Sequence, residues 1–369
     1  MDINNKKLNI LYISKLSGNL YAGPNHSVPA QVKAQSKYDN VLWYNINNVK
    51  RPEWSVDGLD CKNLDDFPSG RLKDLPEPFN RPDMAVVEEF YCYPFCRIIE
   101  DLIKEKIPFV IVPRSEMTKQ AQAKSSTKKL IGNALYFKRM AKKAAAIQYL
   151  TDQEYIDSGD KWNRDYYIIS NGTDAKENIK DKYSEDSIEA VYIGRYEMYQ
   201  KGLDILFEAI ARIKEDLRQN HFMLKMYGVD QENTVNELKK MMAEYKIEDL
   251  IEINDSVFGE EKERVLLKSD VFVMTSRFEG MPMGMIEALS YGLPCIASKG
   301  TNLSDVIKEY DAGWVTDDSV DSVVDGLKTM IAEKNAFDEK GRNAIALANN
   351  YTWDSLAQKS HEIFAGLIR

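Results

Sequence analysis

The sequence contains few residues of the kinds that build metal or disulfide sites. It has three histidines and four cysteines, Cys61, Cys92, Cys96 and Cys295, in 369 residues. The cysteine spacings do not match a zinc site, so we expect buried free thiols, as in a cytosolic protein. Residues 8–13 are apolar, but this run is too short for a signal sequence or a transmembrane helix. We interpret it as the first strand of a cytoplasmic protein.

Two common phosphate-binding motifs are also absent. The chain contains neither a Walker A loop nor a G-x-G-x-x-G run, so no P-loop and no simple dinucleotide fingerprint is indicated. The net charge is −9 and no nucleic-acid recognition motif is present. We therefore do not expect nucleic acid as a partner.

Length and apolar periodicity predict two α/β domains. A chain of 369 residues is long for one domain, and its apolar runs alternate with helix-like stretches, as in a parallel sheet covered by helices. The runs of the first half are residues 8–13, 41–46, 84–87, 109–112, 147–150 and 167–169. A second series begins near Glu189. We predict domains at residues 1–172 and 188–350, a polar linker at 173–187 and a final helix at 351–369.

Two glutamates stand out after the apolar run 271–274. Glu279 and Glu287 are separated by seven residues, which places one carboxylate on a strand-to-helix loop and the other about one turn into the helix. Gly280 and Gly284 permit close backbone approach, and the free amides of a helix start attract anions. Because phosphate would repel carboxylates, the glutamates more plausibly accept hydrogen bonds from sugar hydroxyls. This pattern favours a nucleotide-sugar site, although both glutamates alone would also suit ordinary surface charges.

Two cations flank another strand-to-helix loop. Gly194 and Arg195 end an apolar strand, and Lys201 precedes a helix with apolar residues at helical spacing. Two cations at such a loop can neutralise a diphosphate, and each charge-assisted contact is worth about 1.5–3 kcal/mol. The alternative is that both are surface cations.

In order and spacing, these blocks resemble the retaining glycosyltransferases of family four, whose GT-B fold has two Rossmann-like parallel-sheet domains facing a cleft. The resemblance covers most of residues 189–315 and includes the 291–294 segment Tyr-Gly-Leu-Pro. In this fold the C-terminal helix crosses back to the N-terminal domain. The N-terminal half resembles the family more loosely.

The resemblance implies a role for each matching residue. Arg195 and Lys201 would hold the donor diphosphate, Glu287 the ribose hydroxyls, and Glu279 with the amides of residues 280–284 the donor sugar and phosphates. The remaining residues expected to line the donor site are Gly194, Gly228, Phe258, Gly280, Met281, Met283 and Gly284. We expect no metal and no cofactor, because two cations and helix N-termini neutralise the charge.

The N-terminal half departs from the family at two places. Ala22 replaces the first glycine of a pair that opens the first helix, which leaves Gly23 to approach the donor and His26 as a candidate cleft residue. A lone histidine is more often structural. Many relatives carry His-Gly where this chain has Pro113 and Arg114, as in a subset that resembles bacterial polysaccharide-assembly enzymes. Arg114 is a candidate contact to donor or acceptor, and a structural or membrane-facing role is an equal alternative.

A basic segment follows. Residues 1–180 carry a net charge of +4 and the remainder −13. Between Arg114 and Lys143 nine basic residues stand against Glu116 alone, with apolar residues between them. The segment could lie on an anionic membrane surface, or it could be a solvated helix packed on its own sheet.

These features predict a retaining hexosyltransferase that moves a sugar from a nucleoside-diphosphate donor, UDP- or GDP-linked, to a glycan or lipid-linked acceptor in surface polysaccharide synthesis. Two other classes stay open. One is a catalytically retired glycosyltransferase that acts as a partner subunit, and the other is a GT-B sugar epimerase or phosphorylase.

Overall fold

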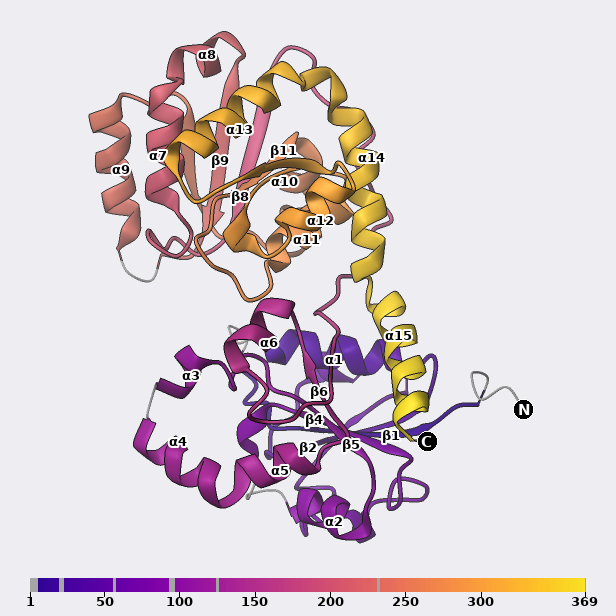
Figure 1. The fold of residues 1–369 in the computed structure, drawn as a ribbon. Helices are drawn as coiled ribbons and strands as arrows, with labels where there is room; N and C mark the ends of the chain where they lie inside the picture. Colours follow the sequence, from indigo (N-terminus) through magenta and orange to yellow (C-terminus); the bar gives the residue numbers. More distant parts are fainter. Residues whose placement is uncertain are drawn as a thin grey trace. The chain divides into compact units, whose positions relative to one another are not determined.

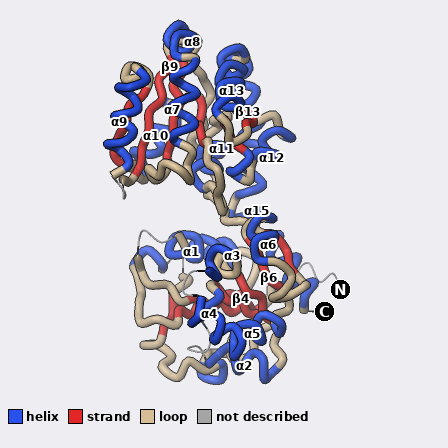
Figure 2. The backbone as a smooth tube through the Cα atoms, turned by 60° about the vertical axis from the view of Figure 1, so that its left-hand side comes forward, coloured by secondary structure: helices blue, strands red, loops and turns tan. Residues whose placement is uncertain are grey.

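The structure is a computed structural model, and it describes residues 6–19, 23–55, 58–92, 97–123, 126–230 and 233–368. The chain divides into two compact units. The N-terminal unit comprises residues 1–172 and 353–369, and the C-terminal unit comprises residues 173–352. Each unit is a parallel sheet between two layers of helices (Figures 1 and 2). The predicted fold class is therefore confirmed.

The N-terminal unit contains a seven-stranded parallel sheet in the order β3-β2-β1-β4-β5-β6-β7. All six apolar runs predicted as strands form strands, and the three-residue edge strand β3 is an addition that its polar sequence did not signal. The strands are β1 (Asn9–Ser14), β2 (Asn40–Asn45), β3 (Cys61–Asn63), β4 (Met84–Glu88), β5 (Phe109–Val112), β6 (Ala146–Tyr149) and β7 (Tyr166–Ile168).

Helices cover both faces of this sheet. Alternate residues of β1 face opposite cores: Leu11 and Ile13 pack with α2, and Ile10 and Tyr12 pack with α1 and α15. The helices are α1 (Pro24–Gln35), α2 (Arg97–Glu105), α3 (Lys119–Ala123), α4 (Ser126–Gly132), α5 (Lys138–Lys143), α6 (Asp152–Ser158) and α15 (Trp353–Leu367), and a π-helix spans Asn133–Phe137 between α4 and α5.

The C-terminal helix α15 is anchored in the N-terminal unit by a buried carboxylate. Asp39 follows α1, and its Oδ1 lies 2.8 Å from Nδ1 of His361 in α15 and accepts a hydrogen bond from the Leu8 amide at 2.9 Å. Gln35 donates to its other oxygen at 2.7 Å. Three groups thus share one carboxylate, which ties the last helix to the start of β1.

The C-terminal unit contains a six-stranded parallel sheet in the order β10-β9-β8-β11-β12-β13. Its strands are β8 (Ile188–Ile193), β9 (Phe222–Gly228), β10 (Ile251–Asp255), β11 (Val271–Met274), β12 (Cys295–Ser298) and β13 (Gly313–Thr316). Its helices are α7 (Leu203–Arg212), α8 (Lys214–Gln219), α9 (Thr234–Tyr245), α10 (Gly259–Lys268), α11 (Met283–Ser290), α12 (Ser304–Glu309), α13 (Val320–Ala332) and α14 (Phe337–Ala348).

The segment expected as a linker packs against the C-terminal unit. Lys180 forms an ion pair with Asp270 at 3.2 Å, and both side chains are nearly buried. The Tyr183 hydroxyl donates to the carbonyl of Gly292, and the Lys180 amide donates to the carbonyl of Tyr291. Residues 173–187 thus form contacts with α10, α11 and the turn that follows α11.

Candidate active site

The strand order of the C-terminal unit contains one reversal, and the candidate donor residues lie at it. The chain builds outward from β8 to β9 and β10, and then returns to place β11 on the other side of β8. In open α/β sheets, ligands bind at the carboxyl ends of the strands where the order reverses. The loops that leave β8 and β11 at this point are residues 194–202 and 275–282. They carry Arg195, Lys201 and Glu279.

A glycine sets the distance between the two loops. Gly202 has a left-handed backbone (φ +61°), and a Cβ at this position would lie 2.1 Å from the carbonyl oxygen of Thr275. The Thr275 hydroxyl donates to the Gly202 carbonyl at 3.1 Å. Arg277 adds a paired contact, since its guanidinium donates to both carboxylate oxygens of Asp204, each at 2.7 Å. Only glycine at position 202 lets the backbone of the first loop come this close to the Thr275 carbonyl.

Lys201 and Glu279 form a buried ion pair between the loops. The Lys201 ammonium lies 2.6 Å from Oε1 of Glu279, and the two side chains are 10% and 7% exposed. The Ser276 hydroxyl donates to the same oxygen at 2.6 Å. Asn302, after β12, donates to the backbone carbonyl of Glu279 at 2.6 Å. The carboxylate and the loop that bears it are therefore held from three directions.

Arg195 lies in a different environment. Its side chain is exposed, and its guanidinium makes one long contact, 3.4 Å, to the side-chain oxygen of Gln200. A weakly held cation beside a buried Lys–Glu pair is available to an incoming anion. The two cations of this loop thus differ: Lys201 is held in place, and Arg195 is free to reorient.

Glu287 lies in the second turn of α11 and is paired with two lysines. The ammonium of Lys262, in α10, contacts Oε2 of Glu287, and Lys176 lies 4.0 Å from Oε1. Lys176 also lies over the ring of Tyr291, 4.8 Å from its centroid. The sequence analysis did not assign either lysine to the site. Lys262 stands four residues after the candidate Phe258, and this short spacing could have identified it from the sequence. Lys176 lies in the polar segment predicted as a linker, which gives no such indication.

The remaining donor-site candidates surround these pairs. Phe258 immediately precedes α10 and is 69% exposed. Gly284 packs at the end of β8, where a Cβ would lie 3.0 Å from the carbonyl oxygen of Ile193. Gly228 approaches Gly194 closely, since a Cβ on Gly228 would lie 2.1 Å from the Gly194 carbonyl oxygen.

The start of α11 is preceded by Pro282, whose backbone is outside the helical region. Gly280 and Met281 precede it in the loop, and Met283 is the first helical residue. The amides at this helix start carry no side-chain cap.

The N-terminal candidates lie in the other unit. His26 is an exposed residue of the first turn of α1, and Gly23 precedes that helix. Gly23 has a right-handed helical backbone, and a Cβ there would meet nothing within 4 Å. Nothing in the described part of this unit therefore requires a glycine at position 23. Ala22 lies outside the described residues.

Arg114 is buried in a network within the N-terminal unit. Its side chain is 6% exposed, and its Nε donates to Glu88 at 2.8 Å. The other guanidinium nitrogens donate to Ser27 and Gln31 of α1 and to Asn171. Burial raises the pKa of Glu88, and the neighbouring Arg114 opposes that rise. Arg114 therefore joins the ends of β4 and β5 to α1 and does not face the surface.

Comparison with known protein families finds a match to the C-terminal unit. Residues 174–347 match the family described as "Glycosyl transferases group 1". The match spans the C-terminal unit and all four charged donor candidates, so the predicted resemblance is confirmed at this level.

Curated relatives match part of the chain. The GDP-mannose:cellobiosyl-diphosphopolyprenol alpha-mannosyltransferase of Xanthomonas oryzae pv. oryzae is 24% identical over 189 residues, which cover 50% of this chain and 49% of the relative. The UDP-Gal:alpha-D-GlcNAc-diphosphoundecaprenol alpha-1,3-galactosyltransferase of Escherichia coli is 37% identical over 107 residues, 28% of this chain and 27% of the relative. The alignments span about half the length of these relatives or less.

A solved structure extends the likeness of fold to the whole chain. Anabaena Alr3699/HepE in complex with UDP superposes with a TM-score of 0.72 over 97% of this chain and 100% of that one, at 14% identity. The predicted GT-B fold, two parallel-sheet α/β units, is confirmed.

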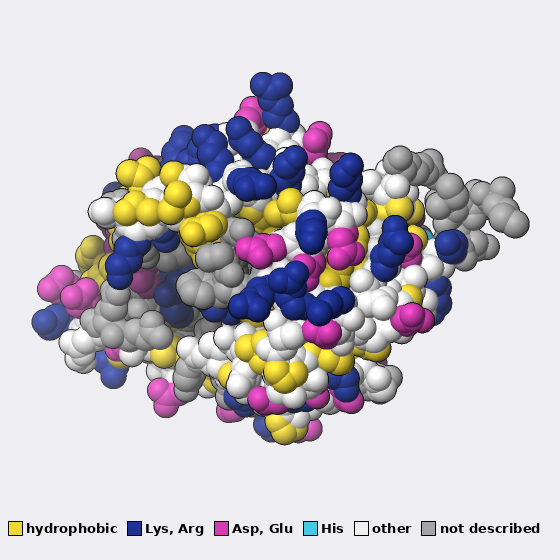
Figure 3. All heavy atoms as spheres, turned by 90° about the horizontal axis from the view of Figure 1, so that it is seen from below, with side chains coloured by type: hydrophobic (Ala, Val, Ile, Leu, Met, Phe, Trp, Pro, Cys, Tyr) yellow, Lys and Arg dark blue, Asp and Glu magenta, His cyan; other side chains and the backbone are white. Residues whose placement is uncertain are grey.

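The basic segment before β6 is partly an exposed surface. It forms α3, α4, the π-helix and α5, with Leu130, Ile131 and Leu135 more than half exposed and Phe137 and Met140 buried. Arg114 and Glu116 do not belong to the exposed part, because Glu116 is mostly buried and accepts backbone hydrogen bonds from Phe90 and Tyr91. Figure 3 shows lysine and arginine side chains gathered beside hydrophobic ones.

The expected absence of a metal and a cofactor and the expected cytoplasmic location remain predictions. Within the described residues no group of three or more His, Cys, Asp or Glu side chains is placed to hold a metal ion. No helix in the described ranges is long and apolar enough to cross a membrane. Cys61 and Cys295 are buried free thiols, as expected, and burial raises the pKa of Cys61 to about 12. The side chains of Cys92 and Cys96 lie outside the described residues.

The spacing of the two loops can be tested with a matched pair of glycines. Gly202 and Gly259 both have left-handed backbones at the start of a helix, but a Cβ on Gly259 would meet nothing within 4 Å. Gly259→Ala should cost about 1 kcal/mol of unfolding free energy from backbone strain alone. Gly202→Ala should cost at least about 2 kcal/mol more, because the methyl group would displace Thr275. Equal losses in urea unfolding would contradict this account of the site.

Proposed function

We propose that this protein is a retaining glycosyltransferase that transfers a sugar from a UDP- or GDP-sugar to a glycan or a lipid-linked saccharide. The observation that carries the proposal is the joining of Lys201 and Glu279 across two strand ends at the reversal point of a group 1 domain. The relatives named above act on diphosphopolyprenol-linked sugars, which supports a lipid-linked acceptor in surface polysaccharide synthesis.

The donor diphosphate would bind the two cations of the β8 loop. Lys201 is held by Glu279 and so presents its ammonium at a defined place, while exposed Arg195 can turn toward a phosphate. The uncapped amides at the start of α11 add hydrogen-bond donors on the opposite side. These groups would neutralise the diphosphate without a metal ion.

Glu287 would bind the donor ribose. Its carboxylate can accept hydrogen bonds from two adjacent hydroxyls, and Lys262 and Lys176 balance its charge before the donor arrives. The exposed ring of Phe258, before the helix that carries Lys262, would lie along the nucleotide base. Glu279 would position the donor sugar through its carboxylate and the amides of residues 280–284.

A same-face transfer would then need no separate base from the protein. The bond between the anomeric carbon and the terminal phosphate oxygen breaks, and a bond from that carbon to the acceptor oxygen forms on the same face. The acceptor hydroxyl proton passes to the departing phosphate oxygen. Arg195, Lys201 and the α11 amides stabilise the negative charge that develops on that oxygen.

A panel of UDP- and GDP-sugars tests the proposal. Wild-type protein should hydrolyse one donor slowly and should do so equally in EDTA, because the protein's own cations neutralise the diphosphate. Arg195→Ala should weaken binding of the matching nucleoside diphosphate by about 1.5–3 kcal/mol in calorimetry. Lys299→Ala is the control, since Lys299 follows β12 at the same sheet edge but is exposed and paired with Asp317.

The outcomes separate the alternatives. Tight donor binding without turnover would indicate a retired glycosyltransferase, and conversion of the donor to an epimer would indicate an epimerase. Turnover that EDTA abolishes and magnesium restores would contradict the metal-independent site. Equal affinity in wild type and Arg195→Ala would remove Arg195 from the diphosphate site.

The two glutamates should differ in kinetics. Glu287→Gln should mainly raise the donor KM, because a ribose contact acts equally in the ground state and the transition state. Glu279→Gln should mainly lower kcat, because it weakens the hold on Lys201 beside the leaving phosphate. Steady-state kinetics with the donor identified by the panel measures both. Wild-type kinetics in both variants would place the site elsewhere.

We also propose that the exposed surface of residues 128–143 docks on an anionic membrane. The protein should sediment with anionic liposomes and be released as salt rises, since charges are screened over about 8–10 Å at physiological ionic strength. Changing exposed Lys128, Lys142 and Lys143 to Gln should abolish sedimentation, whereas changing exposed Lys239, Lys240 and Lys246 to Gln should not. Equal sedimentation with neutral liposomes would contradict docking through charge.

A further inference from the structure

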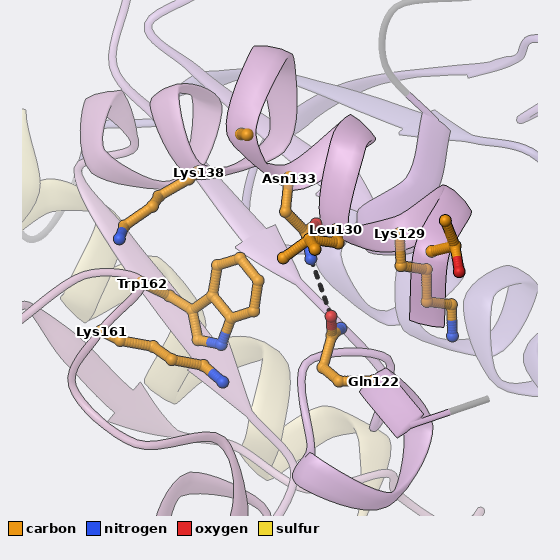
Figure 4. A pocket seen from close by; sticks show the side chains of 9 residues that line it. Gln122, Lys129, Leu130, Asn133, Lys138, Lys161 and Trp162 are labelled. Atoms are coloured by element: carbon orange, nitrogen blue, oxygen red, sulfur yellow. Dashed lines mark hydrogen bonds between the residues drawn. The ribbon is translucent and has the colours of Figure 1, made fainter. Parts of the chain in front are cut away.

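A pocket of about 500 Å³ opens beside the π-helix of the N-terminal unit (Figure 4). The π-helix interrupts α4 and α5, and such interruptions often mark functional sites. The volume is within the range of small-molecule sites. The pocket is lined by Gln122, Thr127, Lys129, Leu130, Asn133, Ala134, Lys138, Lys161 and Trp162.

The polar side of the pocket contains an indole donor without a partner. Trp162 is 3% exposed, and its Nε1 is buried with no hydrogen-bond partner among the described residues. A buried N–H without a partner is costly and uncommon. In Figure 4 the Trp162 ring lies beside Lys138 and Lys161, and its nitrogen is on the edge toward the end of Lys161. An acceptor atom bound in the pocket would satisfy this donor.

Three lysines line the pocket, and two of them, Lys138 and Lys161, lie beside the Trp162 ring in Figure 4. Lys161 lies over the Trp162 ring, 5.1 Å from its centroid, and Lys129 also lines the pocket. Neither Lys138 nor Lys161 forms an ion pair with a residue that the structure describes. The lining residues that the structure describes include no acidic side chain. The pocket is therefore suited to an anion with several negative oxygens.

The other side of the pocket is apolar and continues onto the surface. Leu130 and Ala134 line it, and Leu130 is 71% exposed. Ile131 and Leu135, 57% and 60% exposed, lie on the same helical segment. Large apolar side chains left so exposed beside cations are typical of a surface that contacts an amphiphile.

Hydrogen bonds connect the pocket to the carboxyl ends of β4 and β5. Gln122 donates to the Tyr91 hydroxyl at 2.8 Å and to the Glu116 carbonyl at 2.6 Å. Asn133 donates to the side-chain oxygen of Gln122 at 2.8 Å. Tyr91 follows β4, and Glu116 follows β5. Between β1 and β4 the strand order of this unit reverses, so the pocket lies on the ligand-binding side of its sheet.

We propose that this pocket binds the diphosphate and the adjoining apolar chain of a lipid-linked acceptor. The inference rests on the proposed transfer to such an acceptor and adds where its lipid part is held. Lys138, Lys161 and the Trp162 N–H contact the diphosphate, and Leu130 and Ala134 contact the first part of the chain. A diphosphate ester fits Lys138 and Lys161 better than the phosphodiester of a membrane phospholipid, which carries a single negative charge.

Farnesyl diphosphate is a soluble probe of this site, and calorimetry on the full-length protein measures its binding. It should bind at least about tenfold more tightly than farnesol, inorganic diphosphate or a short-chain phosphatidylglycerol, because only farnesyl diphosphate carries both a diphosphate and an apolar chain. Trp162→Phe keeps the ring and removes the N–H, and it should weaken binding about tenfold.

Two matched pairs of variants locate the site. The double change Lys138→Gln with Lys161→Gln should weaken binding at least tenfold, whereas Lys239→Gln with Lys240→Gln removes the same charge outside the pocket and should change it less than twofold. Leu130→Asn should weaken binding severalfold, and Ile156→Asn, at an exposed apolar residue of α6 outside the lining, should not.

Several outcomes would overturn the inference. The inference is wrong if farnesyl diphosphate does not bind, or if the pocket and control variants weaken its binding equally. It is also wrong if the short-chain phospholipid binds as tightly as farnesyl diphosphate. Donor hydrolysis is measured in the same variants. If it is normal while the probe fails to bind, the pocket assignment is wrong and the proposed function stands. If hydrolysis is absent in the wild type while the probe binds as expected, the proposed function is wrong and the pocket remains a lipid-diphosphate site.

Discussion

The arrangement of the C-terminal unit depends on the contact between the loops that leave β8 and β11. Gly202 lets its backbone approach the Thr275 carbonyl, and this approach places Lys201 within 2.6 Å of Glu279. An ion pair so little exposed is stable only when both partners stay in register, because either charge alone would be buried without compensation. The start of α11 and the position of Asn302 follow from the same contact.

The two units have similar parallel sheets, but the arginines near their reversal points lie in different environments. Each is a parallel sheet with one reversal of strand order. In the C-terminal unit the reversal point presents Arg195 to solvent beside a paired lysine. In the N-terminal unit the neighbouring strand ends carry Arg114, whose guanidinium is consumed by Glu88 and three polar side chains. Arg195, which is exposed, is available to a ligand, whereas Arg114, which is buried in these contacts, stabilises the fold.

The charge difference between the halves of the chain has a structural counterpart. The positive excess of the N-terminal half is concentrated in the helical segment that follows β5, where lysines surround exposed leucine and isoleucine side chains and the edge of Trp162. A surface of this composition favours anionic amphiphiles. The candidate donor residues and this surface belong to different units.

Local pattern was enough to predict the elements and to place the candidate donor residues on loops and helices. The apolar runs gave the strands, and the spacing of Glu279 and Glu287 placed one on a loop and the other in α11, because periodicity and turn chemistry act over a few residues. Pairing was decided only by the tertiary structure. Lys176 and Lys262 meet Glu287 from other segments of the chain, and the Arg114 side chain is buried although most of the described basic residues that follow it, from Lys119 to Lys143, are exposed. Such contacts depend on strand order and helix packing, which no local window of sequence contains.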